Sequence, residues 1–170
     1  MSAILTAASW NSARPCPNRF PQNNNPRMTI AQENPSVRPT TASPCITTNH
    51  VAVTRDFYQT FFDARLAFDC GWYISLEFGE ELSLQFMEPQ AGQPLCNTEG
   101  LTYNFCVADV DREYTRITAA GLTPALPIED HPWGDRGFAV KDPNGIMLYI
   151  YSNREPAPEF KQYVVAPGAA

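Results

Sequence analysis

Hydrophobic positions follow two alternating kinds of spacing along the first half of the chain after residue 44. Val53, Phe57 and Phe61 recur every four residues, which predicts a helix over 53–64. Short runs rich in apolar and β-branched residues, separated by turn residues, predict strands near 45–48, 66–70, 73–78 and 82–87. The elements of this half therefore run strand, helix, strand, strand, strand.

The second half repeats this order. A strand over 101–107 precedes a helix that Asp109 is suited to cap and that Gly121 ends. Further strands are predicted at 122–125, 137–140 and 146–151. We therefore predict an α+β fold of two βαβββ modules, with residues 126–136 as a longer connection in the second.

Matching residues support a duplication. A shift of 56 residues places Tyr58 on Tyr114, and a shift of 64 places the two final strands together, so that Gln85 lies opposite Tyr149. Each such module covers one sheet face with its helix and leaves the other face uncovered. Two modules with sheets curving toward each other would enclose a cleft, where ligands commonly bind.

Alternation in the last strand indicates what lines that cleft. Met147, Tyr149 and Tyr151 alternate with Leu148 and Ile150, so one face is aromatic and the other aliphatic. We expect the aliphatic face to pack on the helix and the tyrosines to face the cleft. Packing of the tyrosines in the core is the alternative.

Composition changes sharply near residue 42. Residues 1–42 carry six prolines and an Asn23–Asn25 run, which predicts a flexible tail. We expect a folded domain at 43–155, made of modules 43–90 and 100–153, and a C-terminal tail at 156–170. The first twenty residues hold two arginines and no acid but lack the apolar core of a secretory signal, so we expect an untargeted, cytoplasmic protein. Translation from Met28 is the alternative.

Composition also narrows the partners. No run of 18 apolar residues exists, and the net charge is −6, which argues against a membrane span and against nucleic acid as the partner. The five cysteines are odd in number and show no CxxC pair, which favours reduced thiols over disulfides or a zinc site. We expect each cysteine to be a small buried hydrophobe.

Several motifs point to a family. The segments FYQTFF, DVD, AAGLTP and above all WGDRGFAVKDPNGIMLYIY make residues 43–153 resemble the vicinal oxygen chelate superfamily. This superfamily includes glyoxalase I, extradiol dioxygenases, fosfomycin resistance enzymes and bleomycin resistance proteins. The resemblance implies a curved mixed-sheet cup built from the two modules. It leaves the function open, because the superfamily includes both enzymes and non-catalytic binders.

The resemblance also implies where metal ligands would lie. Metal-dependent members place His, Gln or Glu at positions that here are Ser43, Gln85, Thr102 and Tyr149. Only Gln85 is a usual ligand type, so we predict no metal and no cofactor. We expect neither histidine to restore the site, because His50 falls between strand and helix and His131 in the long connection.

These observations predict a metal-independent protein that sequesters an aromatic or antibiotic-like small molecule, as the resemblance to bleomycin resistance proteins implies. No catalytic residue is assigned. The expected ligand contacts are Trp72, Gln85, Thr102, His131, Trp133, Arg136, Phe138, Tyr149 and Tyr151. The alternatives are a metal-dependent lyase, isomerase or dioxygenase, a scaffold without ligand, and a Trp133 that only covers the core.

A homodimer is expected because members of this superfamily commonly dimerise. Phe160, Tyr163 and Val164 are apolar at helical spacing after two prolines and are candidates for the interface. Packing on their own subunit is equally compatible with this pattern.

Overall fold

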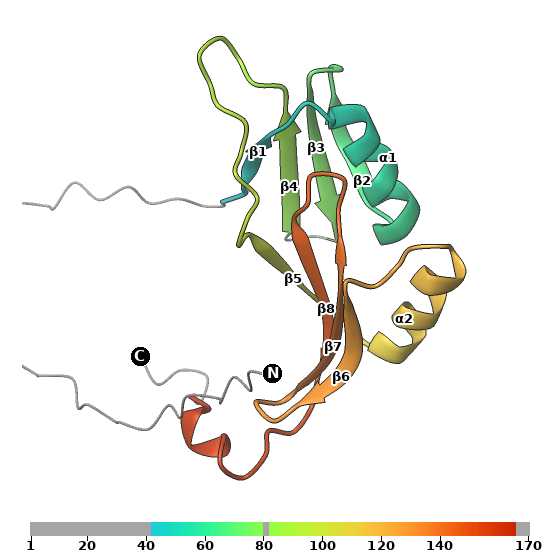
Figure 1. The fold of residues 1–170 in the computed structure, drawn as a ribbon, viewed down its shortest axis with the longest axis vertical. Coiled ribbons are helices and arrows are strands. Elements are labelled where there is room, and N and C mark those ends of the chain that lie inside the picture. Colours follow the sequence, from blue (N-terminus) through green and yellow to red (C-terminus); the bar gives the residue numbers. More distant parts are fainter. Residues whose placement is uncertain (1–41, 80–81, 166–170) are drawn as a thin grey trace, which may run out of the picture. The chain divides into compact units, whose positions relative to one another are not determined.

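A computed structural model describes residues 42–79 and 82–165. It contains two four-stranded mixed sheets, each with one α-helix on one face (Figure 1). The predicted flexible tail lies, except for Ala42, outside the described residues. No helix in the described ranges has both the length and the apolar sequence needed to cross a bilayer.

The first module consists of β1 (Cys45–Thr47), α1 (Val51–Phe62), β2 (Arg65–Asp69), β3 (Tyr73–Phe78) and β4 (Leu82–Met87). Its sheet has the order β1-β4-β3-β2, in which β1 runs parallel to β4 and the other pairs are antiparallel. Asp63 follows the last helical residue and adopts the left-handed conformation common where helices stop.

The second module repeats this arrangement with β5 (Thr102–Cys106), α2 (Val110–Ala119), β6 (Leu126–His131), β7 (Asp135–Lys141) and β8 (Met147–Asn153). Its sheet has the equivalent order β5-β8-β7-β6. Asp109 caps α2 as predicted, because its carboxylate accepts a hydrogen bond from the Arg112 amide at 3.0 Å. A short 3₁₀ helix, Lys161–Tyr163, follows. The prediction of two βαβββ modules is thus confirmed.

The third strand of this module lies in a different place from the prediction. A strand was expected at 122–125, but the strand beside β7 is Leu126–His131, preceded by one backbone hydrogen bond from Ala125 to Ala139 at 2.7 Å. The pairing shifts between Leu126 and Glu129, which breaks the simple alternation that sequence reasoning depends on. His131, expected in a loop, is therefore the last residue of a strand.

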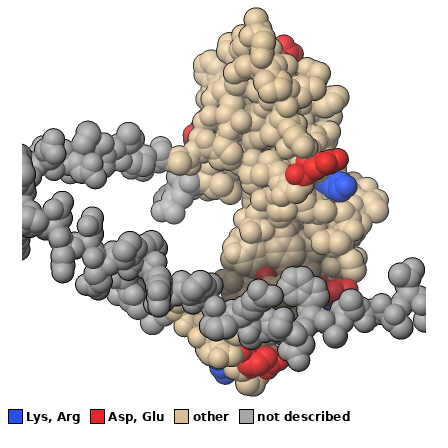
Figure 2. Space-filling view, turned by 60° about the vertical axis from the view of Figure 1, so that its left-hand side comes forward, with Lys and Arg blue, Asp and Glu red and all other residues tan. Residues whose placement is uncertain are grey.

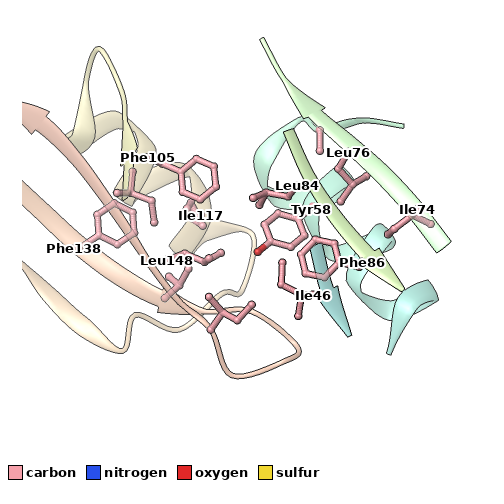
Figure 3. Close-up of a cluster of buried hydrophobic side chains, with 14 of the residues drawn as sticks. Ile46, Tyr58, Ile74, Leu76, Leu84, Phe86, Phe105, Ile117, Phe138 and Leu148 are labelled. Atoms are coloured by element: carbon pink, nitrogen blue, oxygen red, sulfur yellow. The ribbon is translucent and has the colours of Figure 1, made fainter. Parts of the chain in front are cut away.

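The core lies between the sheets and their helices. Tyr58 of α1, Phe86 of β4 and Leu148 of β8 are fully buried there (Figure 3). Leu148 and Ile150 point toward this core and Tyr149 does not, as the alternation in β8 predicted. Truncating one of these large buried side chains to alanine removes about 2–5 kcal/mol of stability.

The DPNG turn between β7 and β8 joins the two modules. The Asp142 side chain is buried and accepts a hydrogen bond from the phenol of Tyr58 on α1 at 3.2 Å. Asn144 donates to Thr54 at 3.0 Å and accepts from Thr48 at 2.5 Å. The turn therefore links the second module to the first helix through buried, mutually satisfied polar groups.

The expectation of buried cysteines is wrong for Cys45, Cys70 and Cys106, which are exposed, and Cys96 is half-buried. Cys45 and Cys106 pair in register with Gln85 and Tyr151, so they share the sheet faces that no helix covers. Cys16 lies outside the described residues.

Candidate functional site

The sheet faces opposite the helices are the candidate binding surfaces (Figure 1). On the second sheet, Tyr149 pairs in register with Asn104 and Ala139, and Tyr151 pairs with Cys106 and Gly137. Residues paired in this way point to the same side of a sheet. Tyr149 and Tyr151 are half-buried, and their rings stack at 5.7 Å with an interplanar angle of 13°.

The ring of Tyr149 lies directly over Gly137. A Cβ atom at position 137 would come within 2.4 Å of the Tyr149 Cζ and hydroxyl oxygen, so only glycine leaves room for the ring. This close passage directs the phenol toward the start of β7. There it donates a hydrogen bond to Asp135 Oδ1 at 2.9 Å.

Asp135 is the centre of a polar cluster that we define as His131, Trp133, Asp135 and Tyr149. Besides the phenol, its carboxylate contacts His131 Nδ1 at 2.8 Å and accepts a hydrogen bond from Trp133 Nε1 at 2.9 Å. The Trp133 and His131 rings stack at 4.3 Å and 11°. Gly134, with φ of 109°, forms the turn that returns the chain from β6 to β7.

The electrostatics of the polar cluster keep Tyr149 protonated. Burial, followed by the hydrogen bond to Asp135 and the charge of that carboxylate, raises the pKa of the Tyr149 phenol well above its usual range. The phenol therefore serves as a neutral hydrogen-bond donor at physiological pH. Tyr149 lies where the resemblance places a metal ligand, but its hydroxyl is already engaged by a carboxylate.

The other three positions implied for metal ligands are no better suited. Gln85 donates its side-chain amide to Ser43 Oγ at 2.8 Å, and Thr102 is an exposed hydroxyl. Across residues 42–79 and 82–165, no three His, Cys, Asp or Glu side chains gather in a way that could hold a metal ion. Neutral hydroxyls and one amide are weak donors for zinc, nickel or iron, so these residues do not fit such a centre.

The uncovered face of the first sheet is also aromatic. Tyr73 on β3 contacts Phe68 with ring centroids 5.8 Å apart and Trp72 with centroids 6.0 Å apart. Phe68 and Trp72 are 53% and 46% exposed. Sequence reasoning missed Phe68, because an irregularity in β2 after Leu66 turns its side chain to the uncovered face.

Two predicted contacts lie on the helix side instead. Arg136 pairs with Asp111 of α2 at 3.0 Å and with Asp130 at 2.8 Å. Phe138 is fully buried against Tyr114, with ring centroids 5.1 Å apart. Both are one residue out of step with Asp135 and Gly137, so the alternation of β7 turns them away from the tyrosines.

A hollow of about 640 Å³ lies at the end of the second sheet. Thr102, Lys141 and Met147 line it from three neighbouring strands and share the uncovered face with Tyr149. Figure 2 turns the side of the uncovered faces forward, and most of the described surface there carries no charge. His50 lines a separate cavity of about 190 Å³, which the first module shares with the connection between the modules and with the DPNG turn.

The structure thus brings together His131, Trp133, Tyr149 and Tyr151 of the predicted contacts. It places Gln85 on the other sheet and Trp72 in the turn that precedes β3 of that sheet. Asp135, which holds the polar cluster together, was not among the predicted residues. Its position four residues after His131, across a glycine turn, was the available signal.

Comparisons with known proteins agree with this architecture. The solved structure of a glyoxalase/bleomycin resistance protein/dioxygenase from Nocardioides is similar with a TM-score of 0.58 and 21% identity, covering 72% of this chain and 89% of that one. TnmS3, an antibiotic binding protein from Streptomyces sp. CB03234, is similar with a TM-score of 0.57 and 18% identity, covering 69% of this chain and 98% of that one. Lactoylglutathione lyase from Agrobacterium tumefaciens is similar with a TM-score of 0.55 and 17% identity, covering 68% of this chain and 95% of that one.

These likenesses establish a shared fold. By their names, TnmS3 is a binding protein and the lactoylglutathione lyase is an enzyme. No curated protein matches this chain in sequence. The family model described as Glyoxalase/Bleomycin resistance protein/Dioxygenase superfamily matches residues 40–150. The chain therefore belongs to the glyoxalase/bleomycin resistance protein/dioxygenase superfamily.

Proposed function

We propose that this protein binds and sequesters an aromatic, antibiotic-like small molecule without a metal ion. The observation that carries this proposal is the geometry of Tyr149, at the position where the resemblance to metal-dependent members implies a ligand. Its phenol donates to Asp135 and its ring stacks beside Tyr151. The position thus presents an aromatic surface in place of a metal-binding group.

The lining supports an aromatic ligand. Tyr149 and Tyr151 on one sheet, and Phe68, Trp72 and Tyr73 on the other, leave ring surface exposed or half-exposed on the uncovered faces. Each well-placed aromatic contact adds about 0.5–1.5 kcal/mol beyond the burial of its area. The likeness in fold to an antibiotic binding protein is in keeping with this reading.

A cytoplasmic homodimer is part of the proposal. Tyr163, Val164 and Val165 are 63–75% exposed, and a second copy of the chain would remove such apolar surface from water. Exposed free thiols at Cys45, Cys70 and Cys106 suit a reducing compartment. Replacing Phe160 and Tyr163 together with serine is expected to give monomers in sedimentation, and an unchanged mass would exclude these residues from the interface.

Elemental analysis of protein purified without a polyhistidine tag or chelator tests the absence of a metal. Calorimetric titrations with Ni²⁺, Zn²⁺, Mn²⁺ and Fe²⁺ should then show no tight one-to-one binding.

Aromatic compounds screened by tryptophan fluorescence should bind. Tyr151→Ala should weaken their binding more than Val53→Ala, which alters an exposed side chain on α1. Stoichiometric metal would favour the alternative, a metal-dependent lyase, isomerase or dioxygenase.

A further inference from the structure

Besides the aromatic rings of Tyr149 and Tyr151, the polar cluster offers a ligand an imidazole nitrogen that can accept a hydrogen bond. We propose that His131 Nε2 accepts a hydrogen bond from a hydroxyl group on the ligand, so that the site selects hydroxylated aromatic molecules such as phenols. This inference rests on the proposed aromatic-binding function and adds the chemical group that is recognised. It depends on the tautomer of His131, its accessibility and its orientation.

The contact with Asp135 determines the tautomer. A carboxylate only accepts hydrogen bonds, so the 2.8 Å contact from Asp135 Oδ1 to His131 Nδ1 requires a proton on Nδ1. The Tyr149 hydroxyl, 3.1 Å from the same nitrogen, then gives its own proton to Asp135 at 2.9 Å. A neutral imidazole that is protonated on Nδ1 carries its lone pair on Nε2.

Accessibility follows from the hydrogen-bond inventory of the described residues. His131 has a side-chain exposure of 22%, and no hydrogen bond to Nε2 is found among residues 42–79 and 82–165. Within those ranges, the Tyr103 hydroxyl is the one side-chain nitrogen or oxygen that is both buried and without a partner. His131 Nε2 also lacks a partner there but is not buried, so it is in contact with solvent and available to a ligand.

Its neighbours fix the orientation of the ring. Trp133 stacks on the imidazole at 4.3 Å and is itself held by its indole N–H on Asp135. Asp135 is only 13% exposed and receives donors from three side chains, so it cannot readily turn away. This acceptor lies beside the half-buried Tyr149. It should bind an aromatic ring that carries a hydroxyl group better than one that carries an alkyl ether, which has no proton to donate.

Binding of 2-naphthol and 2-methoxynaphthalene to the full chain, measured by calorimetry, tests the inference. We expect 2-naphthol to bind about tenfold more tightly, the effect of one well-formed hydrogen bond. His131→Phe keeps an aromatic ring and should make the two probes equal, whereas His50→Phe, at the other histidine, should keep the preference. Equal binding to the wild-type protein would overturn this inference alone, and no binding of either probe would overturn the proposed function as well.

The tautomer is measurable without a ligand or a substitution at the site. At pH 8.5, above the titration range of ordinary imidazoles, ¹⁵N-detected correlation spectra distinguish the two neutral tautomers. We expect the proton of His131 on Nδ1, with His50→Phe assigning the two histidine signals. A proton on Nε2 would overturn the inference even if His131→Phe fails to fold.

Discussion

The phenol of Tyr58 donates a hydrogen bond to Asp142, a residue 84 positions later in the chain. Both groups are buried, and the contact joins the first helix of one module to the DPNG turn of the other. Asp142 also accepts from the backbone amides of Asn144 and Ile146, at 2.8 and 2.9 Å. The turn therefore both reverses the chain and connects the two modules. The neighbouring tyrosine, Tyr103, provides a comparison with Tyr58.

Tyr58→Phe and Tyr103→Phe should have opposite consequences. The first change removes one of the donors to the buried Asp142 carboxylate and should lower the free energy of unfolding by about 1–3 kcal/mol, as is usual for hydrogen bonds to charged groups. The second removes a hydroxyl that is buried without a hydrogen bond, so stability should stay level or rise. Urea unfolding of both variants provides the measurement. A large loss in Tyr103→Phe would mean that this hydroxyl does have a partner.

Alkaline pH should destabilise the protein through Tyr103. Burial above all, with smaller contributions from Cys96, Asp142 and Cys45, raises the pKa of Tyr103 to about 12. The unfolded chain loses this proton near pH 10 while the folded chain keeps it. The free energy of unfolding should therefore fall as the pH rises from about 10 toward 12, and urea titrations at stepped pH should show a shallower fall in Tyr103→Phe.

Gly137→Ala should displace the ring of Tyr149. The added methyl group would lie 2.4 Å from that ring, so the phenol must leave Asp135, and we expect a loss of about 1–3 kcal/mol. Tyr149→Ala supplies the control. In that background the same glycine substitution should have little effect, and a double-mutant cycle measured by urea unfolding should show strong coupling. Additive effects would contradict the packing described for this pair.

Much of the architecture was predictable, and the exceptions share a cause. The bounds of β3 and β4 coincide with the predicted strands, and the cap at Asp109 was identified, because each depends on local spacing or local chemistry. The position of β6 was predicted wrongly and Phe68 was missed, and in both strands an irregular register changes which side a residue faces. Such irregularities depend on the partner strand, which the local pattern does not contain.

The candidate site divides in the same way. The direction of Tyr149 followed from alternation, whereas its bond to Asp135 depends on the passage over Gly137 and on the length of a turn. Arg136 and Phe138 were expected beside the ligand for the chemistry of their side chains, but both lie on the helix side of β7. Nearness in sequence within a strand places half of the residues on the wrong face.

Arg136→Ala therefore separates the two faces experimentally. Its guanidinium is paired with Asp111 and Asp130 on the helix side, so its removal should leave the binding of aromatic ligands unchanged. We expect stability to change little, as is usual for ion pairs with exposed partners. Calorimetry alongside Tyr151→Ala, which should weaken binding, makes the comparison. Equal losses in the two variants would contradict the assignment of faces.

Gly137 and Tyr149 are twelve residues apart in the sequence and are sterically dependent on each other. In related sequences the two positions should then vary together: an aromatic residue at the second requires glycine at the first, whereas a carboxylate there releases the first from that constraint. Glycine at the first position would then mark those relatives that carry an aromatic ring at the second, a pattern readable from sequence alone.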